Sequence, residues 1–161
     1  MLFAVPPEIF NNIKLIADRF FDKQEIDYLF MQTTGNNFFF GKDINHEVEC
    51  LLPHLKKILS APFDNIFSSN VSMVRSFGIT HHVDQDGDCL LICTRGDNYV
   101  FGYHDKETDD GNKYPMPKSV TLEPGQAVLF RADRYHSLYS FKPSEQPFEC
   151  VLIGLDAEDC L

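Results

Sequence analysis

The sequence predicts an α+β fold in which N-terminal helices support a mainly β jelly roll, a double-stranded β-helix of the cupin-like type. The chain has 161 residues, which suits one domain at the usual ~150 residues per domain. Apolar residues recur at helical spacing in residues 1–69, whereas residues 70–161 are short β-branched and aromatic segments separated by turn-forming residues. We therefore expect a single domain over residues 1–161, with helical support in 1–69 and a jelly-roll core in 70–161.

Two helices are expected in the first third of the chain. The first begins at Pro6-Pro7-Glu8, because proline is favoured in a first helical turn. Its apolar residues are spaced by three and four, as an amphipathic helix requires: Ile9, Ile13, Ile16, Ala17, Phe20 and Phe21. The second should start after Asp43, a possible N-cap, and end near Leu59, with Pro53 kinking or dividing it.

Two segments are predicted to be loops. Thr33–Asn37, between the helices, is polar and contains glycine, and the following Phe38–Phe40 is interpreted as core filling. Asp105–Pro117 contains two prolines and several turn-forming residues. A loop of that length often covers a site.

Short alternating segments bounded by Gly, Pro, Asn and Asp are typical of strands. The expected strands are Val71–Phe77, Ile79–Val83, Cys89–Arg95, Tyr99–Tyr103, Ser119–Leu122, Ala127–Phe130, Ser137–Phe141 and Cys150–Leu155. Eight short strands suit a double-sheet jelly roll.

Composition excludes several classes of protein. The formal net charge of −10 disfavours a nucleic-acid partner, since duplex phosphates would be repelled. No apolar run reaches the ~18 residues of a membrane span, and the first ten residues lack the features of a secretory signal, so a cytoplasmic protein is expected. The five cysteines are widely spaced and form no CxxC, which predicts reduced, mostly buried thiols.

The segment Thr80–Asp84 carries the residues that predict chemistry. In a strand the side chains at positions i and i+2 share a face, so His82 and Asp84 can meet one metal ion. His136 follows a turn, a strand and a second turn, and can supply a third ligand. Two histidines and one carboxylate on one side of a metal leave open positions opposite, as in non-haem iron(II) oxygenases.

At these residues the sequence resembles the iron(II)/2-oxoglutarate-dependent dioxygenases. His82-Val83-Asp84, followed 52 residues later by His136, is similar to their HxD…H signature, with Pro124-Gly125 before the distal histidine. The residue pattern of Met73–Arg95 resembles that of their prolyl-hydroxylase-like branch. The resemblance implies an enzyme that binds iron(II) through these three residues, uses 2-oxoglutarate and O2, and hydroxylates a C–H bond. The substrate implied is a peptide side chain or a small amino-acid-like molecule.

One departure from the family pattern concerns the co-substrate. These enzymes usually place Arg or Lys in the last strand to bind the far carboxylate of 2-oxoglutarate, and residues 145–155 contain no basic residue. Arg95 and Lys142 are the two candidate replacements, and Arg95 is preferred because ~20 Å of extended chain would separate Lys142 from His136. Arg75 could steer a carboxylate or could form an ion pair.

Two other functions remain open. A cupin-type metal protein would share the jelly roll, but cupins usually carry HxH and a Glu where this chain has His82-Val83-Asp84. A metal-free jelly roll that acts as a binding module would explain the missing basic residue in the last strand.

Overall fold

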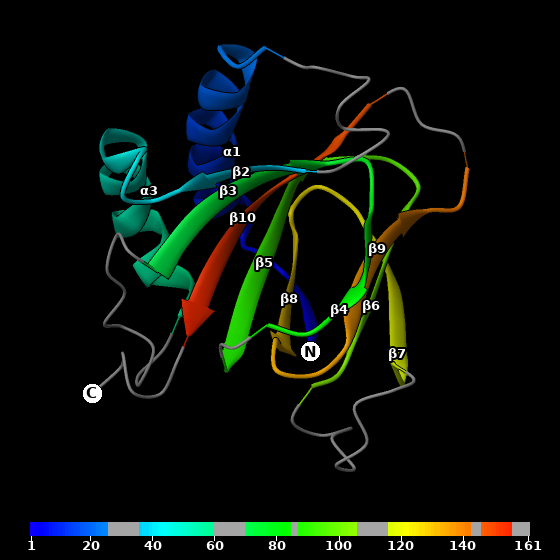
Figure 1. The fold of residues 1–161 in the computed structure, drawn as a ribbon. Coiled ribbons are helices and arrows are strands. Elements are labelled where there is room, and N and C mark those ends of the chain that lie inside the picture. The colour runs from blue at the N-terminus through cyan, green and yellow to red at the C-terminus, as the bar shows by residue number, and fades with distance from the viewer. Residues whose placement is uncertain (26–35, 60–69, 85–86, 106–115, 143–145, 156–161) are drawn as a thin grey trace.

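The computed structural model describes residues 1–25, 36–59, 70–84, 87–105, 116–142 and 146–155. Two antiparallel sheets face each other (Figure 1). The six-stranded sheet has the order β1-β8-β5-β10-β3-β2 and the four-stranded sheet the order β4-β9-β6-β7. The strands are β1 (Leu2–Ala4), β2 (Asn37–Phe40), β3 (Val71–Ser76), β4 (Ile79–His82), β5 (Asp88–Arg95), β6 (Tyr99–Tyr103), β7 (Lys118–Leu122), β8 (Gln126–Arg131), β9 (His136–Ser140) and β10 (Phe148–Leu155).

Two helices cover the outer face of the six-stranded sheet. They are α1 (Pro7–Asp22) and α3 (Asn45–Ile58), on the left in Figure 1, with the four-stranded sheet on the right. The buried face of α1 is formed by Ile13, Ala17, Phe20 and Phe21, four of the residues whose spacing predicts the helix. These side chains belong to one apolar core between helices and sheet.

A second core fills the space between the two sheets, and β5 separates it from the first. Leu90 and Ile92 face the helices, whereas Cys89, Leu91 and Cys93 face the four-stranded sheet. This division follows from the two-residue period of a strand. None of the four described cysteines forms a disulfide; Cys89, Cys93 and Cys150 are buried and Cys50 is exposed, so the expectation of mostly buried thiols holds for the described cysteines.

The predicted fold class is confirmed, and each of the eight expected strands is present with bounds shifted by a few residues at most. The prediction missed β1 and β2, which pair with β8 and β3 at the two edges of the six-stranded sheet. Core filling was right for Phe39, which packs under α1. It was wrong for Phe38 and Phe40, which are exposed on the other side of β2, with their rings stacked.

The second helix differs from its prediction in two details. Its N-cap residue is Ile44, without a side-chain cap, so Asp43 does not have the expected role. Pro53 lies inside α3, which continues undivided to Ile58. Its ring is on an exposed face, where solvent can satisfy the carbonyl that proline leaves without a donor.

Within the described part of the chain, the structure contains no helix of the length and apolar character needed to span a membrane.

Candidate metal centre

His82, Asp84 and His136 meet where β4 ends and β9 begins. His82 is the last residue of β4 and pairs directly with His136, the first residue of β9. Asp84 follows two residues later, and its backbone N–H donates to the carbonyl of Ala132 over 2.8 Å. The antiparallel pairing and this hydrogen bond therefore bring side chains that are far apart in the sequence to one point.

The three side chains converge through their ligand atoms. One such atom from each residue lies within 4.8 Å of the other two. Asp84 Oδ2 is 3.1 Å from His136 Nε2, and Asp84 Oδ1 is 3.7 Å from His82 Nε2. The structure thus brings together the three residues chosen as metal ligands from the sequence.

Backbone hydrogen bonds fix the orientation of both imidazoles. His82 Nδ1 lies 2.8 Å from the carbonyl oxygen of Thr80, and His136 Nδ1 lies 2.9 Å from that of Arg134. A carbonyl oxygen only accepts, so we assign the ring proton to Nδ1, and in the neutral ring Nε2 directs its lone pair at Asp84. Two lone pairs and a carboxylate that face one another need a cation between them, either a ring proton or a metal ion.

Asp84 is held in its ionised form. Its side-chain hydrogen bond with His136 lowers the pKa of Asp84 below the ordinary value, against the opposing effect of burial. The side chain is 46% exposed, whereas that of His136 is 7% exposed. The carboxylate is therefore available as an anionic ligand at the edge of a buried histidine.

The cluster borders an inner cavity between the sheets with a volume of about 100 Å³. Its polar lining among the described residues is limited to the three cluster residues and Ser76; the remainder is Phe38, Val74, Ile79, Cys89, Leu91, Phe101, Phe130, Leu138, Phe148, Cys150 and Leu152. No described Lys or Arg side chain borders it. An apolar wall beside a polar cluster is the usual composition of a small-molecule site.

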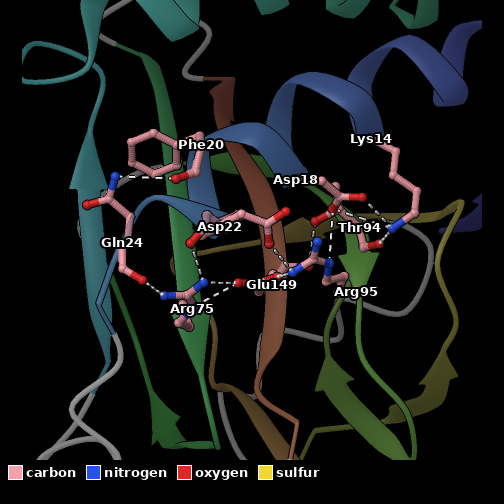
Figure 2. Close-up of polar contacts among 10 residues, drawn as sticks. Lys14, Asp18, Phe20, Asp22, Gln24, Arg75, Thr94, Arg95 and Glu149 are labelled. Atoms are coloured by element: carbon pink, nitrogen blue, oxygen red, sulfur yellow. Dashed lines mark hydrogen bonds and ion pairs between the residues drawn. The ribbon is translucent and has the colours of Figure 1, made fainter.

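Arg95 lies outside this cavity, on the helix side of the six-stranded sheet (Figure 2). It forms ion pairs with Asp18 and Asp22 of α1, at 3.1 and 3.0 Å, and with Glu149 of β10 at 3.2 Å.

A register shift explains this placement of Arg95. Cys150 pairs with Cys93, but Glu149 pairs with Arg95, so β5 holds one extra residue at this point. A one-residue shift moves the following side chain to the opposite face of the sheet. Arg95, at the end of β5, therefore faces the helices and not the cavity.

The other two basic candidates also lie away from the cavity. Lys142 is exposed two residues beyond β9, with Nζ 5.9 Å from the ring centre of Phe141. Arg75 is buried on the helix side, where it forms an ion pair with Glu149 at 2.7 Å and donates to the carbonyl of Phe21. Of the two roles open to Arg75, the structure shows the ion pair.

Phe38 is a cavity residue that the sequence reasoning missed. It is 43% exposed and also borders the cavity, so it lies at the rim. Its position on β2 opposite Val74 brings it there, and this pairing with a distant strand leaves no signal within Phe38–Phe40. In the expected covering loop, Asp105 is buried and pairs with Lys118 at 2.7 Å, whereas residues 106–115 lie outside the described part of the chain.

No protein-family model and no curated protein matches the sequence. Solved structures do match in fold. The non-haem α-ketoglutarate-dependent epimerase SnoN of nogalamycin biosynthesis is 13% identical over 97% of this chain and 78% of its own, with a TM-score of 0.59. A Trichoplax adhaerens prolyl hydroxylase, in complex with a hypoxia-inducible-factor peptide fragment, is 11% identical over 99% and 84%, with a TM-score of 0.54.

Escherichia coli YcfD has the same fold within a longer chain. One of its structures is 15% identical over 83% of this chain and 37% of YcfD, with a TM-score of 0.54. Another, described as a ribosomal oxygenase, is matched over 28% of its length. The present chain therefore spans less than two fifths of YcfD. Together these structures show that the chain has the jelly-roll fold found in 2-oxoglutarate-dependent oxygenases.

Proposed function

We propose that the protein is a non-haem iron(II) oxygenase that hydroxylates a C–H bond of a peptide side chain or of a small amino-acid-like molecule. The observation that carries this proposal is the convergence of His82, Asp84 and His136 within 4.8 Å beside a cavity. The prolyl hydroxylase of similar fold was solved in complex with a peptide, which supports a peptide as one candidate substrate. The net charge of −10 disfavours nucleic acid.

The chemistry of the donor set fits iron(II). Two imidazole nitrogens and one carboxylate oxygen are the ligands of the facial arrangement that leaves metal positions open for other molecules. A cupin-type centre would need a further histidine and a glutamate, whereas the described cluster contains a single carboxylate and two histidines. When bound, iron supplies the activation of dioxygen.

The surrounding residues have three tasks in this proposal. The carbonyls of Thr80 and Arg134 hold the imidazoles with Nε2 toward the metal position. The hydrogen bond from the Asp84 backbone N–H to the Ala132 carbonyl fixes the backbone that carries the carboxylate. Phe101, Phe130 and Leu138 exclude water from the inner side of the cluster, which limits side reactions of an activated oxygen species.

The expected co-substrate, 2-oxoglutarate, fits this cavity only in part. Its 2-oxo acid end needs open metal positions, which the cluster can leave. Its far carboxylate needs a cationic partner, and no described Lys or Arg borders the cavity. The described lining therefore offers no partner for that carboxylate.

Oxygen consumption tests the proposal directly. The protein is loaded anaerobically with iron(II), mixed with panels of 2-oxo acids, amino acids and peptides, and exposed to air-saturated buffer. We expect dioxygen uptake and a hydroxylated product for one substrate class, with neither above the background of free iron in His136→Ala. Dioxygen uptake that is equal in the wild type and the variant across every panel would contradict an enzyme based on this cluster. Failure of the wild type to bind iron would favour the metal-free binding module.

A further inference from the structure

Apart from the metal cluster itself, no charged side chain among the described residues borders the inner cavity. A ligand that extends from the metal into the cavity would therefore find no charged partner there. Apart from the cluster, Ser76 is the one polar lining residue. Its hydroxyl donates to Asn36 Oδ1 and accepts from the Gly78 N–H at 2.9 Å. The hydroxyl proton is therefore already used.

The two thiols that border the cavity supply no charge either. Burial raises the pKa of the Cys150 thiol far above its ordinary value, so the thiol is neutral at physiological pH. Cys89 is also a buried thiol outside any disulfide. Both side chains act as small apolar groups in this wall.

The guanidinium groups of Arg75 and Arg95 are committed on the other side of the sheet. Arg75 is 2% exposed and faces Glu149 and the end of α1. Arg95 is shared among Asp18, Asp22 and Glu149. Bringing Arg75 into the cavity would take from buried Glu149 its closest cationic partner, which is costly.

The size of the cavity restricts what an apolar ligand can be. Its volume of about 100 Å³ is smaller than the roughly 150 Å³ of an apolar cavity that holds benzene. Val74, Leu91 and Leu152 supply aliphatic surface there, and each methylene buried against such surface favours binding. A short branched aliphatic group suits both the volume and the lining.

From these observations we infer that the ligand that shares the cavity with the metal is a 2-oxo acid with an uncharged, branched aliphatic tail, not the dicarboxylate 2-oxoglutarate. This inference rests on the proposed iron centre. With dioxygen as oxidant, such an acid loses its carboxyl carbon as CO2, and the shorter carboxylate takes one oxygen atom. The substrate C–H bond takes the other as hydroxyl, and each organic molecule gives up two electrons.

Binding without turnover tests the inference. The iron(II)-loaded full chain is titrated anaerobically with 4-methyl-2-oxopentanoate and with 2-oxoglutarate, and the visible charge-transfer absorption of the chelated 2-oxo acid is followed. We expect the aliphatic acid to bind at least about 100-fold more tightly, because the far carboxylate of 2-oxoglutarate would be buried without a partner. Equal or tighter binding of 2-oxoglutarate would overturn the inference.

The outcome separates this inference from the proposed function. Iron binding followed by no absorption with either acid overturns the inference and leaves the iron centre intact. Absence of iron binding overturns the proposed function, and the inference with it.

A variant provides a second, independent arm. Leu152 borders the cavity from β10 and is only partly buried, so Leu152→Arg introduces a guanidinium with room to adjust. We expect it to raise the affinity for 2-oxoglutarate at least about tenfold and to lower that for the aliphatic acid. Leu152→Met, which keeps the wall apolar, should retain the wild-type preference; an unchanged ratio of affinities in Leu152→Arg would contradict the assignment of this cavity to the ligand tail.

Discussion

Two of the regions in which carboxylates lie next to basic or imidazole side chains differ in what completes them. On the helix side of the six-stranded sheet, Arg75, Arg95, Glu149, Asp18 and Asp22 form an ion-pair network (Figure 2). On the inner side, Asp84 faces two imidazoles at the cavity. In the network each charged group has an oppositely charged partner in the chain, whereas the inner cluster has a carboxylate and no fixed cation.

This difference separates a structural group of charges from the proposed metal site. Arg75 satisfies two carbonyls at the end of α1, those of Phe21 and Gln24, and lies over the Phe21 ring at 5.1 Å. The network therefore joins α1 to β3 and β10, and its charges are not available to a ligand. The inner cluster requires a cation from solution or a proton, which is why we assign the chemistry to it.

The largest effect on stability is expected for Arg75→Met. Removal of the guanidinium leaves Glu149, which is 1% exposed, with Arg95 as its remaining cationic partner. Removing one partner of a buried pair costs about 3–5 kcal/mol, to be measured as the free energy of unfolding in urea. The double variant Arg75→Met/Glu149→Leu should recover much of that loss, and a double variant less stable than the single one would show that the network is not the cause.

Loss of one metal ligand should weaken metal binding without unfolding the protein. In His82→Ala we expect the affinity for iron(II) to fall at least about 100-fold, more than loss of an outer partner of a metal ligand usually costs. His81→Ala is the matched control, since the neighbouring His81 ring packs near Tyr135, 5.8 Å between centres, and is not part of the cluster. Similar iron affinities for the two variants would remove His82 from the site.

The pH dependence of stability should reflect the network. Burial raises the pKa of Glu149 above its ordinary 4.5, against the opposing effects of Arg75 and Arg95. The folded state then holds this proton more tightly than the unfolded state, so the associated stability is present below pH 4.5 and is lost as the pH rises through the raised pKa. In Arg75→Met we expect the pKa of Glu149 to rise further. The difference in unfolding free energy between this variant and wild type should therefore widen as the pH rises, by about 1.4 kcal/mol for each pH unit by which the substitution raises this pKa. Urea unfolding of both proteins at each pH measures this difference, and a difference that stays constant between pH 5 and 8 would contradict the expectation.

The smallest effect is expected for Arg95→Ala. Its ion pairs with Asp18 and Asp22 are partly exposed, and pairs of that kind contribute about 1 kcal/mol or less. Its third partner, buried Glu149, keeps the closer ion pair with Arg75 at 2.7 Å. Binding of iron(II) and of 2-oxo acids should equal that of wild type within error, since Arg95 lies outside the cavity. A selective loss of 2-oxo acid binding would restore the role that the sequence first suggested for this residue.

Features that depend on neighbours in the sequence were predictable. The eight main strands follow from the local alternation of apolar and polar residues. The position of His82 and Asp84 on one face follows from their two-residue spacing. His136 was found because its turn-strand-turn setting resembles a known signature. The short edge strand β1 has three residues and becomes a strand through pairing with β8, so its own sequence carries little signal.

Features that depend on register between distant segments were not predictable. The side of the sheet on which Arg95 lies is decided by the shift between β5 and β10, where Arg95 pairs with Glu149. The position of Phe38 at the cavity depends on its pairing with Val74. Neither partner is close in the sequence, so alternation within one segment could not reveal the outcome.

Asp84 and two imidazoles are proposed to form a metal site, and an anaerobic calorimetric titration of iron(II) decides whether they do. Wild-type protein and Asp84→Asn, which keeps the size of the side chain and removes its charge, are compared side by side. We predict one iron(II) per chain in the wild type, with an affinity at least about 100-fold higher than in the variant. Equal affinity in the two proteins, or no binding by the wild type, would contradict the account.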